Sequence, residues 1–163
     1  MRLKKKTAKV DERMNKVVLF SELVSDLQKD HIELSNLVFS FQNALGVSDK
    51  KEAKKILDKI VNMTNNHFKF EEGYLYPRLR RLISEIIERL NNEQKTIREF
   101  VSQMHRALHM SRISKNKLYD MSKFIPVVSQ HLRDCDDLIV MADKFGREEK
   151  DELNRKLKEY RKK

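Results

Sequence analysis

The sequence predicts an all-α protein, an up-down-up-down four-helix bundle, and three observations support this prediction. Gly and Pro, the residues that most often interrupt helices, number only three and two among 163 residues. Apolar residues recur three and four positions apart over four long segments, which is the spacing of one buried helix face. Short turn-like stretches separate the segments, so neighbouring helices are expected to run antiparallel.

The first two helices are expected to meet at a turn beginning with Gly46. The first covers about residues 12–45, and Gly46 is the residue type that often follows a helix end. Asp49 can then cap a second helix that begins near Lys50. That helix is expected to end close to Pro77, because proline lacks the backbone N–H that a helix interior uses.

The other two helices carry equally regular apolar faces. The third is expected from about Leu79 to Leu108, and residues 111–117 form the most favourable turn after it. The fourth is expected from Leu118 to Ala142. The chain therefore holds one helical domain of ordinary size.

Positive charge is concentrated at the two ends of the chain. The net charge is +10; residues 1–16 hold seven Lys and Arg against two acidic residues, and residues 146–163 hold eight against five. We therefore expect a basic N-terminal extension (1–16), a bundle (17–145) and a charged C-terminal helix or tail (146–163), with both ends solvated. The middle shows no basic face interleaved with aromatic residues, so nucleic-acid binding is not expected.

Neither secretion nor membrane insertion is expected. No apolar run approaches the ~20 residues that span a bilayer, and no apolar stretch follows the basic start. The single cysteine, Cys135, rules out an intramolecular disulfide and is compatible with a reducing compartment. We expect a cytoplasmic protein.

Polar residues interrupt the apolar face of each helix once, and the four interruptions lie at matching heights. His31 and His67 lie at similar distances along the chain from the turn at Gly46. Gln94 and His131 lie at similar distances from the turn between the third and fourth helices. Because a helix rises only ~1.5 Å per residue, the height differences amount to a few ångströms. The interrupting residues are therefore expected in one layer of the bundle.

The residue types in this layer suit a metal ion. His67 and Glu71 stand four residues apart, on one face of a helix. A single buried histidine is usually a hydrogen-bonded core residue, whereas several histidines and carboxylates at one level are more typical of a metal site. Imidazole and carboxylate ligands suit iron, manganese or zinc.

Three stretches resemble the hemerythrin-like (HHE cation-binding) family. They are D-H-I-E-L around His31, H-F-K-F-E-E-G-Y-L-Y-P around His67, and F-I-P-V-V-S-Q-H-L-R-D-C-D-D around His131. The resemblance implies a four-helix bundle with a non-haem di-iron centre held by His31, His67, Glu71 and His131. It also implies Asp136 as a ligand, because H-x4-D matches an alternative family spacing, with Glu71 and Asp136 bridging the ions.

The ligand from the third helix stays open at this point. One register uses Gln94 with Glu93, which flank the apolar face at the expected height. The other uses His105 and His109, an H-x-x-x-H pair, and needs the turn to move to residues 91–92. Burial directions on a continuous helix favour the first register only slightly.

Cys135 also stays open. It stands four residues after His131, where the family often has a glutamate. A buried cysteine is more typically a small core residue than a metal ligand.

The resemblance implies a protein that binds O₂ or another small diatomic or peroxide ligand at iron, or senses redox state or iron. A binding or sensing protein is expected rather than an enzyme, with a di-iron peroxidase or NO-reducing enzyme as a third option. The alternative is a helical scaffold or binding module with a degenerate or mononuclear site, whose basic tails dock to an acidic partner. A homodimer is one option for the assembly.

Overall fold

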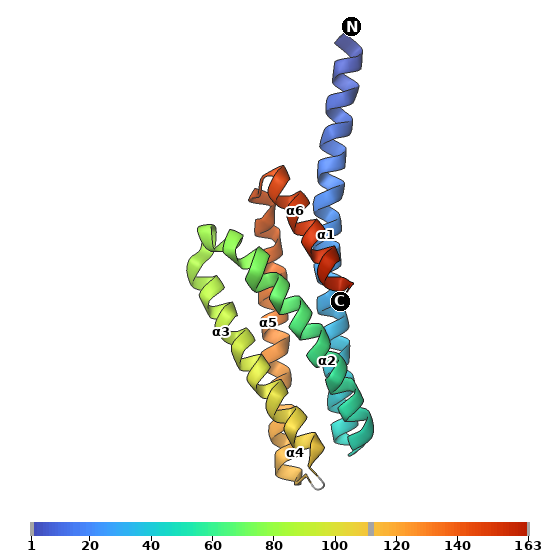
Figure 1. Cartoon of the computed structure of the whole chain (residues 1–163), viewed down its shortest axis with the longest axis vertical. Coiled ribbons are helices and arrows are strands. Elements are labelled where there is room, and N and C mark those ends of the chain that lie inside the picture. The colour runs from blue at the N-terminus through green and yellow to red at the C-terminus, as the bar shows by residue number, and fades with distance from the viewer. Residues whose placement is uncertain (1, 111–112, 163) are drawn as a thin grey trace.

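The computed structural model describes residues 2–110 and 113–162, and all secondary structure among them is helical (Figure 1). The all-α prediction is therefore confirmed. The elements are α1 (Arg2–Gly46), α2 (Lys50–Phe70), a π-helical turn η1 (Glu71–Leu75), α3 (Tyr76–His109), α4 (Lys115–Ser122), α5 (Phe124–Ile139), a 3₁₀ turn η2 (Val140–Lys144) and α6 (Arg147–Arg161).

Helices α1, α2, α3 and α5 form the predicted up-down-up-down bundle. α1 ends at Gly46, and the Asp49 side chain accepts a hydrogen bond from the backbone N–H of Glu52 at the start of α2. The first part of α1 projects beyond the other helices in Figure 1. It contains the expected basic extension, of which Met1 lies outside the described residues and residues 2–16 are described by their backbone alone.

The reversal between the second and third bundle helices lies later than expected. The helical path continues past Pro77 and leaves helical geometry at Ile83, with φ −147° and ψ 58°. Figure 1 shows the chain turning back between α2 and the labelled stretch of α3. Pro77 is accommodated because it sits in the first turn of α3, directly after the π turn has already interrupted the regular hydrogen-bond ladder. The break also shifts the buried face, so that Ile87 is buried and Ile86 is exposed.

The expected fourth helix is divided in two. α4 ends at Ser122, and α5 begins at Phe124 with Pro126 in its first turn, where a missing N–H costs least. Residues 111–112 of the expected turn before α4 lie outside the described residues.

The C-terminal segment differs from the solvated helix or tail that its charge suggested. α6 lies against α1 in Figure 1, and its Leu153 and Leu157 are buried at 0% and 2% exposure. Arg78 of α3 forms an ion pair with Glu152 of α6, which links the two helices. Two leucines four residues apart are enough to give a highly charged helix one apolar edge.

The core is divided into two apolar clusters by a polar layer. Leu27 belongs to one cluster and Leu34 to the other, with His31 between them on α1. On α3, Leu90 and Ile97 flank Gln94 in the same way. The polar layer that the interrupted apolar faces predicted is therefore present. No helix in the described ranges is long and apolar enough to cross a membrane.

Candidate metal centre

The polar layer brings buried side chains from all four bundle helices together. Each is at most 5% exposed, although histidine, glutamate and glutamine are seldom fully buried in proteins. The set comprises His31 from α1, His67 from α2, Glu71 from the start of η1, Gln94 from α3, and His131 and Cys135 from α5.

One group of potential ligand atoms, subsite one, consists of His31, His67 and Glu71. The Nε2 atoms of the two histidines lie 2.9 Å apart. Oε1 of Glu71 lies 3.3 Å from Nε2 of His67 and 4.0 Å from Nε2 of His31. All three ligand atoms lie within 4.8 Å of one another, so one ion could contact all three.

A second group, subsite two, consists of Glu71, His131 and Cys135. Their ligand atoms also lie within 4.8 Å of one another. The Cys135 Sγ atom lies 3.6 Å from Nε2 of His131. The Gln94 amide donates a hydrogen bond to Oε2 of Glu71 and lies 3.5 Å from Nε2 of His131. Glu71 therefore belongs to both subsites. Its Oε1 atom lies near His67 of subsite one, and its Oε2 atom accepts from Gln94 beside subsite two.

Each of the three histidines turns its Nδ1 atom to a carboxylate on a neighbouring helix. The pairs are His31 with Asp136 at 2.6 Å, His67 with Asp30 at 3.5 Å and His131 with Glu93 at 3.1 Å. A carboxylate can only accept, so the ring proton of His31 and of His131 is assigned to Nδ1. Nδ1 of His67 makes no hydrogen bond and faces Asp30 at ion-pair distance only. This arrangement leaves every Nε2 directed at the centre and fixes each ring, as outer carboxylates do in metal sites.

The π turn η1 brings Tyr76 into the centre. A π helix has more residues per turn than an α helix, so it brings residues five apart onto one side. The Tyr76 hydroxyl accordingly donates to Oε2 of Glu71 at 3.2 Å and contacts Sγ of Cys135 at 3.3 Å. Gln94 also donates to this hydroxyl, at 2.9 Å. A regular α helix would have directed Tyr76 elsewhere.

In the metal-free chain His67 and Glu71 form a buried ion pair. Burial by itself disfavours both charges, but His67, followed by His131 and His31, lowers the pKa of Glu71 to about 2. Glu71, together with Asp30, raises the pKa of His67 to about 9 against the same burial. The proton on Nε2 of His67 then lies between two nitrogens and a carboxylate oxygen, where a metal ion could replace it.

The residues of the layer fit a cation. Nε2 of His31 and Nε2 of His67 lie 2.9 Å apart, so they need a shared positive charge between them, which is the proton of His67 in the metal-free chain and could be a metal ion instead. Within the described part of the chain, Oε1 of Gln94 has no hydrogen-bond partner although the side chain is 0% exposed. A buried carbonyl without a partner is costly, and a half turn of the amide would direct this oxygen at an ion in the centre.

The structure does not bring His105 and His109 to this centre. Along α3, His105 follows Gln94 by about three turns, or ~16 Å, and His109 by about four turns, or ~22 Å. His105 is ion-paired with Asp58 at 3.2 Å with its side chain 43% exposed, and His109 is exposed beside Lys54. The register that places Gln94 and Glu93 at the layer is the one the structure adopts.

Asp136 also lies outside the two groups of ligand atoms. Its side chain is 42% exposed and binds the outer nitrogen of His31, so it lies on the side of the ring opposite the centre. The resemblance implied that Asp136 bridges the two ions. The structure instead places its carboxylate on the outer nitrogen of His31, away from the centre. Cys135, one residue earlier, points inward instead, because α5 turns ~100° per residue.

Two contributors, Tyr76 and Asp30, were not predicted from the sequence, whereas Cys135 was left open. Tyr76 enters the centre through the π turn, which has no clear sequence signal. Asp30 adjoins His31, yet its partner is His67 on another helix. Cys135 did carry a signal, namely its spacing of four residues from His131, which repeats that of Glu71 from His67.

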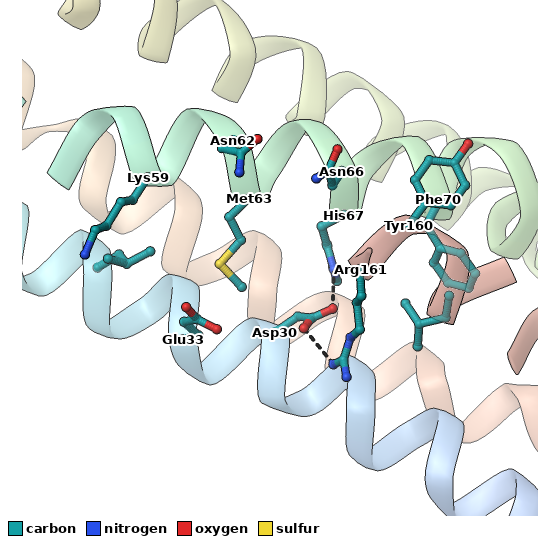
Figure 2. Close-up of a pocket in the computed structure, with 12 residues that line it drawn as sticks. Asp30, Glu33, Lys59, Asn62, Met63, Asn66, His67, Phe70, Tyr160 and Arg161 are labelled. Carbon is teal, nitrogen blue, oxygen red and sulfur yellow. Dashed lines mark hydrogen bonds and ion pairs between the residues drawn. The ribbon is translucent and has the colours of Figure 1, made fainter. Parts of the chain in front are cut away.

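A pocket of about 350 Å³ reaches the outer side of subsite one. It lies between α1, α2 and α6, and Figure 2 shows Asp30 between His67 and Arg161. Arg161 is ion-paired with Asp30 at 2.7 Å, so the last turn of α6 holds the carboxylate that orients His67. Burial by itself would raise the pKa of Asp30, but the contacts with His67 and Arg161 outweigh burial and lower it.

A family model described as the hemerythrin HHE cation binding domain matches residues 22–142. The match spans most of the chain and all four bundle helices. Searches of curated proteins and of solved structures found no match.

Proposed function

We propose, since the chain belongs to the hemerythrin HHE cation-binding family, that its polar layer holds a non-haem di-iron centre that binds O₂ or a related small ligand. Membership confirms the resemblance seen in the three histidine-containing stretches and implies a cation-binding site. The observation that carries the two-ion proposal is the buried carboxylate of Glu71, which is shared by two groups of potential ligands.

The first ion would be held by Nε2 of His31, Nε2 of His67 and Oε1 of Glu71. The second would be held by Nε2 of His131 and by Glu71, with Gln94 beside it. Imidazole and carboxylate ligands suit iron, with manganese or zinc as alternatives. When bound, iron supplies Lewis acidity and reversible electron transfer toward a small ligand.

The chain's own residues would orient the ligands and the small molecule. The three outer carboxylates hold the imidazole rings with Nε2 inward, which raises their basicity as ligands. The Tyr76 hydroxyl and the Gln94 amide are hydrogen-bond donors next to Glu71, in a region closed to bulk water. In the metal-free chain both donate to Glu71, and a small ligand that accepts hydrogen bonds would take over these donors when the carboxylate binds an ion.

Metal analysis tests the centre. The chain is loaded with Fe²⁺ without oxygen, passed through a desalting column and analysed for metal, and about two ions per chain are expected. His67→Gln and Glu71→Gln keep polar side chains of similar size and are expected to lose most of the bound iron. The double variant His105→Ala/His109→Ala is the matched control, because it removes two histidines outside the centre, and it should keep both ions.

The stoichiometry separates the proposal from its alternatives. One ion per chain would indicate a mononuclear centre, consistent with Gln94 being a weaker ligand than a histidine. Fewer than one ion, or no loss in Glu71→Gln, would refute the centre and favour a helical scaffold whose basic N-terminal helix docks to an acidic partner. Loss of iron in the His105/His109 control would favour the other register.

Absorption spectra separate binding from catalysis. A reversible spectral change on adding and removing O₂ supports a small-ligand-binding protein. Sustained turnover of peroxide or NO would instead show a di-iron enzyme. We further infer a reducing, cytoplasmic setting, because the centre contains a free thiol, Cys135.

A further inference from the structure

We propose that Cys135 is a thiolate ligand of subsite two, so that the two subsites are chemically unequal. The inference rests on the proposed metal centre and goes beyond its histidine and carboxylate ligands. It is carried by the position of the sulfur and its polar neighbours, by the charge that two bound ions would bring, and by the buried amide of Gln94.

The sulfur lies where a ligand would have to lie. His131 and Cys135 are four residues apart on α5, and His67 on α2 and Glu71 at the start of η1 have the same spacing. The Sγ atom is buried and, with Nε2 of His131 and an oxygen of Glu71, forms a group of atoms all within 4.8 Å. An ion among these three atoms would therefore contact the sulfur.

The surroundings of this thiol are polar, unlike those of an ordinary core cysteine. Sγ contacts the Tyr76 hydroxyl at 3.3 Å and Nε2 of His131 at 3.6 Å. Buried cysteines that only fill space behave as small hydrophobic residues among apolar neighbours. A thiol placed between an imidazole nitrogen, a phenol and a carboxylate is placed for coordination.

Charge balance gives a second reason. Two divalent ions would bring four positive charges into a layer where Glu71 is the one buried carboxylate among the described residues. Asp136 cannot add its charge directly, because its carboxylate is bound to the outer nitrogen of His31. Deprotonated Cys135 would place a second negative charge inside the centre, and buried charge needs such compensation.

The amide of Gln94 gives a third, independent reason. Its Oε1 atom is fully buried without a hydrogen-bond partner among the described residues, while its nitrogen lies 3.5 Å from Nε2 of His131. In the structure the amide nitrogen faces the centre and donates to Glu71 and Tyr76. A half turn of the amide exchanges its oxygen and nitrogen, and the oxygen would then reach an ion bound by His131 and Cys135.

Coordination of the thiol would change which ion this subsite prefers. The sulfur–hydrogen bond breaks, the proton passes to solvent, and the sulfur electron pair forms the bond to the ion. Thiolate is a soft ligand that favours ions such as Zn²⁺ or Co²⁺ over Mn²⁺ or Mg²⁺. Subsite one, with two imidazoles and a carboxylate, lacks this preference.

Zinc and cobalt loading of the purified full chain test the assignment. With Zn²⁺, X-ray absorption of the wild-type chain should show a sulfur shell at ~2.3 Å besides nitrogen and oxygen at ~2.0–2.1 Å. With Co²⁺, the near-ultraviolet spectrum should show a thiolate charge-transfer band. Cys135→Ala and Cys135→Ser should lose the sulfur shell and the band, whereas the double variant His105→Ala/His109→Ala, which changes residues outside the centre, should keep both.

The outcomes distinguish this inference from the proposed centre. Two bound ions with only nitrogen and oxygen ligands would refute the thiolate and leave the centre intact. Absence of any bound ion would refute both. The wild-type spectrum is decisive by itself if a Cys135 variant fails to fold, because a sulfur shell has no other source in subsite two.

Discussion

Replacing Glu71 by glutamine in the metal-free chain should destabilise the fold in a pH-dependent way. The substitution keeps the size of the side chain but removes the charge that pairs with His67. His67 would then be buried with only Asp30, at 3.5 Å, as a counter-charge. Its pKa should fall toward or below the ordinary value of 6.5.

The magnitude follows from the raised pKa of His67. The difference between about 9 in the folded chain and 6.5 in the unfolded chain corresponds to about 3 kcal/mol at ~1.4 kcal/mol per pKa unit. Because this pKa is raised on folding, the stabilisation is complete below pH 6.5 and is lost as the pH rises through 9. Glu71 is the larger source of the raised pKa, so Glu71→Gln should remove about 2–3 kcal/mol at pH 6 and much less at pH 10.

Urea unfolding followed by circular dichroism, with a chelator present, measures this difference at both pH values. Glu72→Gln is the matched control, because Glu72 is the next residue and forms a partly exposed pair with Arg98 at 2.6 Å. That variant should lose less than ~1 kcal/mol, equally at pH 6 and pH 10. An equal loss at both pH values in Glu71→Gln would refute the buried ion pair.

Three further predictions concern the surroundings of the centre. Leu157→Ala should lower the free energy of unfolding by about 2–5 kcal/mol because the side chain is fully packed, whereas a loss below ~0.5 kcal/mol in urea unfolding would show that α6 is solvated. Asp136→Asn should weaken iron binding by roughly 10–100-fold in competition with a coloured chelator, whereas Asp137→Asn, at the exposed neighbouring residue, should not. Equal iron affinities of the two variants would show that the Asp136 carboxylate does not support His31 as a ligand. Arg161→Ala should weaken iron binding less than Asp30→Asn does, because Arg161 acts only through that carboxylate, and the reverse order would contradict this link.

The sequence predicted the layer of the centre because that layer depends on regular helices. Apolar residues at helical spacing define a buried face, and a histidine within such a face has to be buried with it. His31, His67 and His131 were found in this way, and the distances from the turn at Gly46 placed two of them at one height. For the third helix the sequence left two registers, because a turn at residues 91–92 would bring His105 to the layer in place of Gln94. The structure has continuous helix there and leaves His105 partly exposed.

The sequence did not predict the irregular segments. The π turn holds one more residue than a turn of α helix. A single turn of five residues, Glu71–Leu75, is too short to show a periodicity of apolar residues that differs from that of an α helix. The reversal at Ile83 has neither glycine nor proline beside it. In α6 the charged residues outnumber Leu153 and Leu157, so only the structure shows that those two leucines complete the core.

The carboxylate shared by both subsites makes their occupation thermodynamically linked. An ion in subsite one would displace the proton of His67 and fix Glu71 in place, so a second ion would find its carboxylate already ordered. By reciprocity, the second ion strengthens the first by the same factor. Iron loading of this chain is therefore expected to be cooperative, with few singly loaded molecules at half saturation.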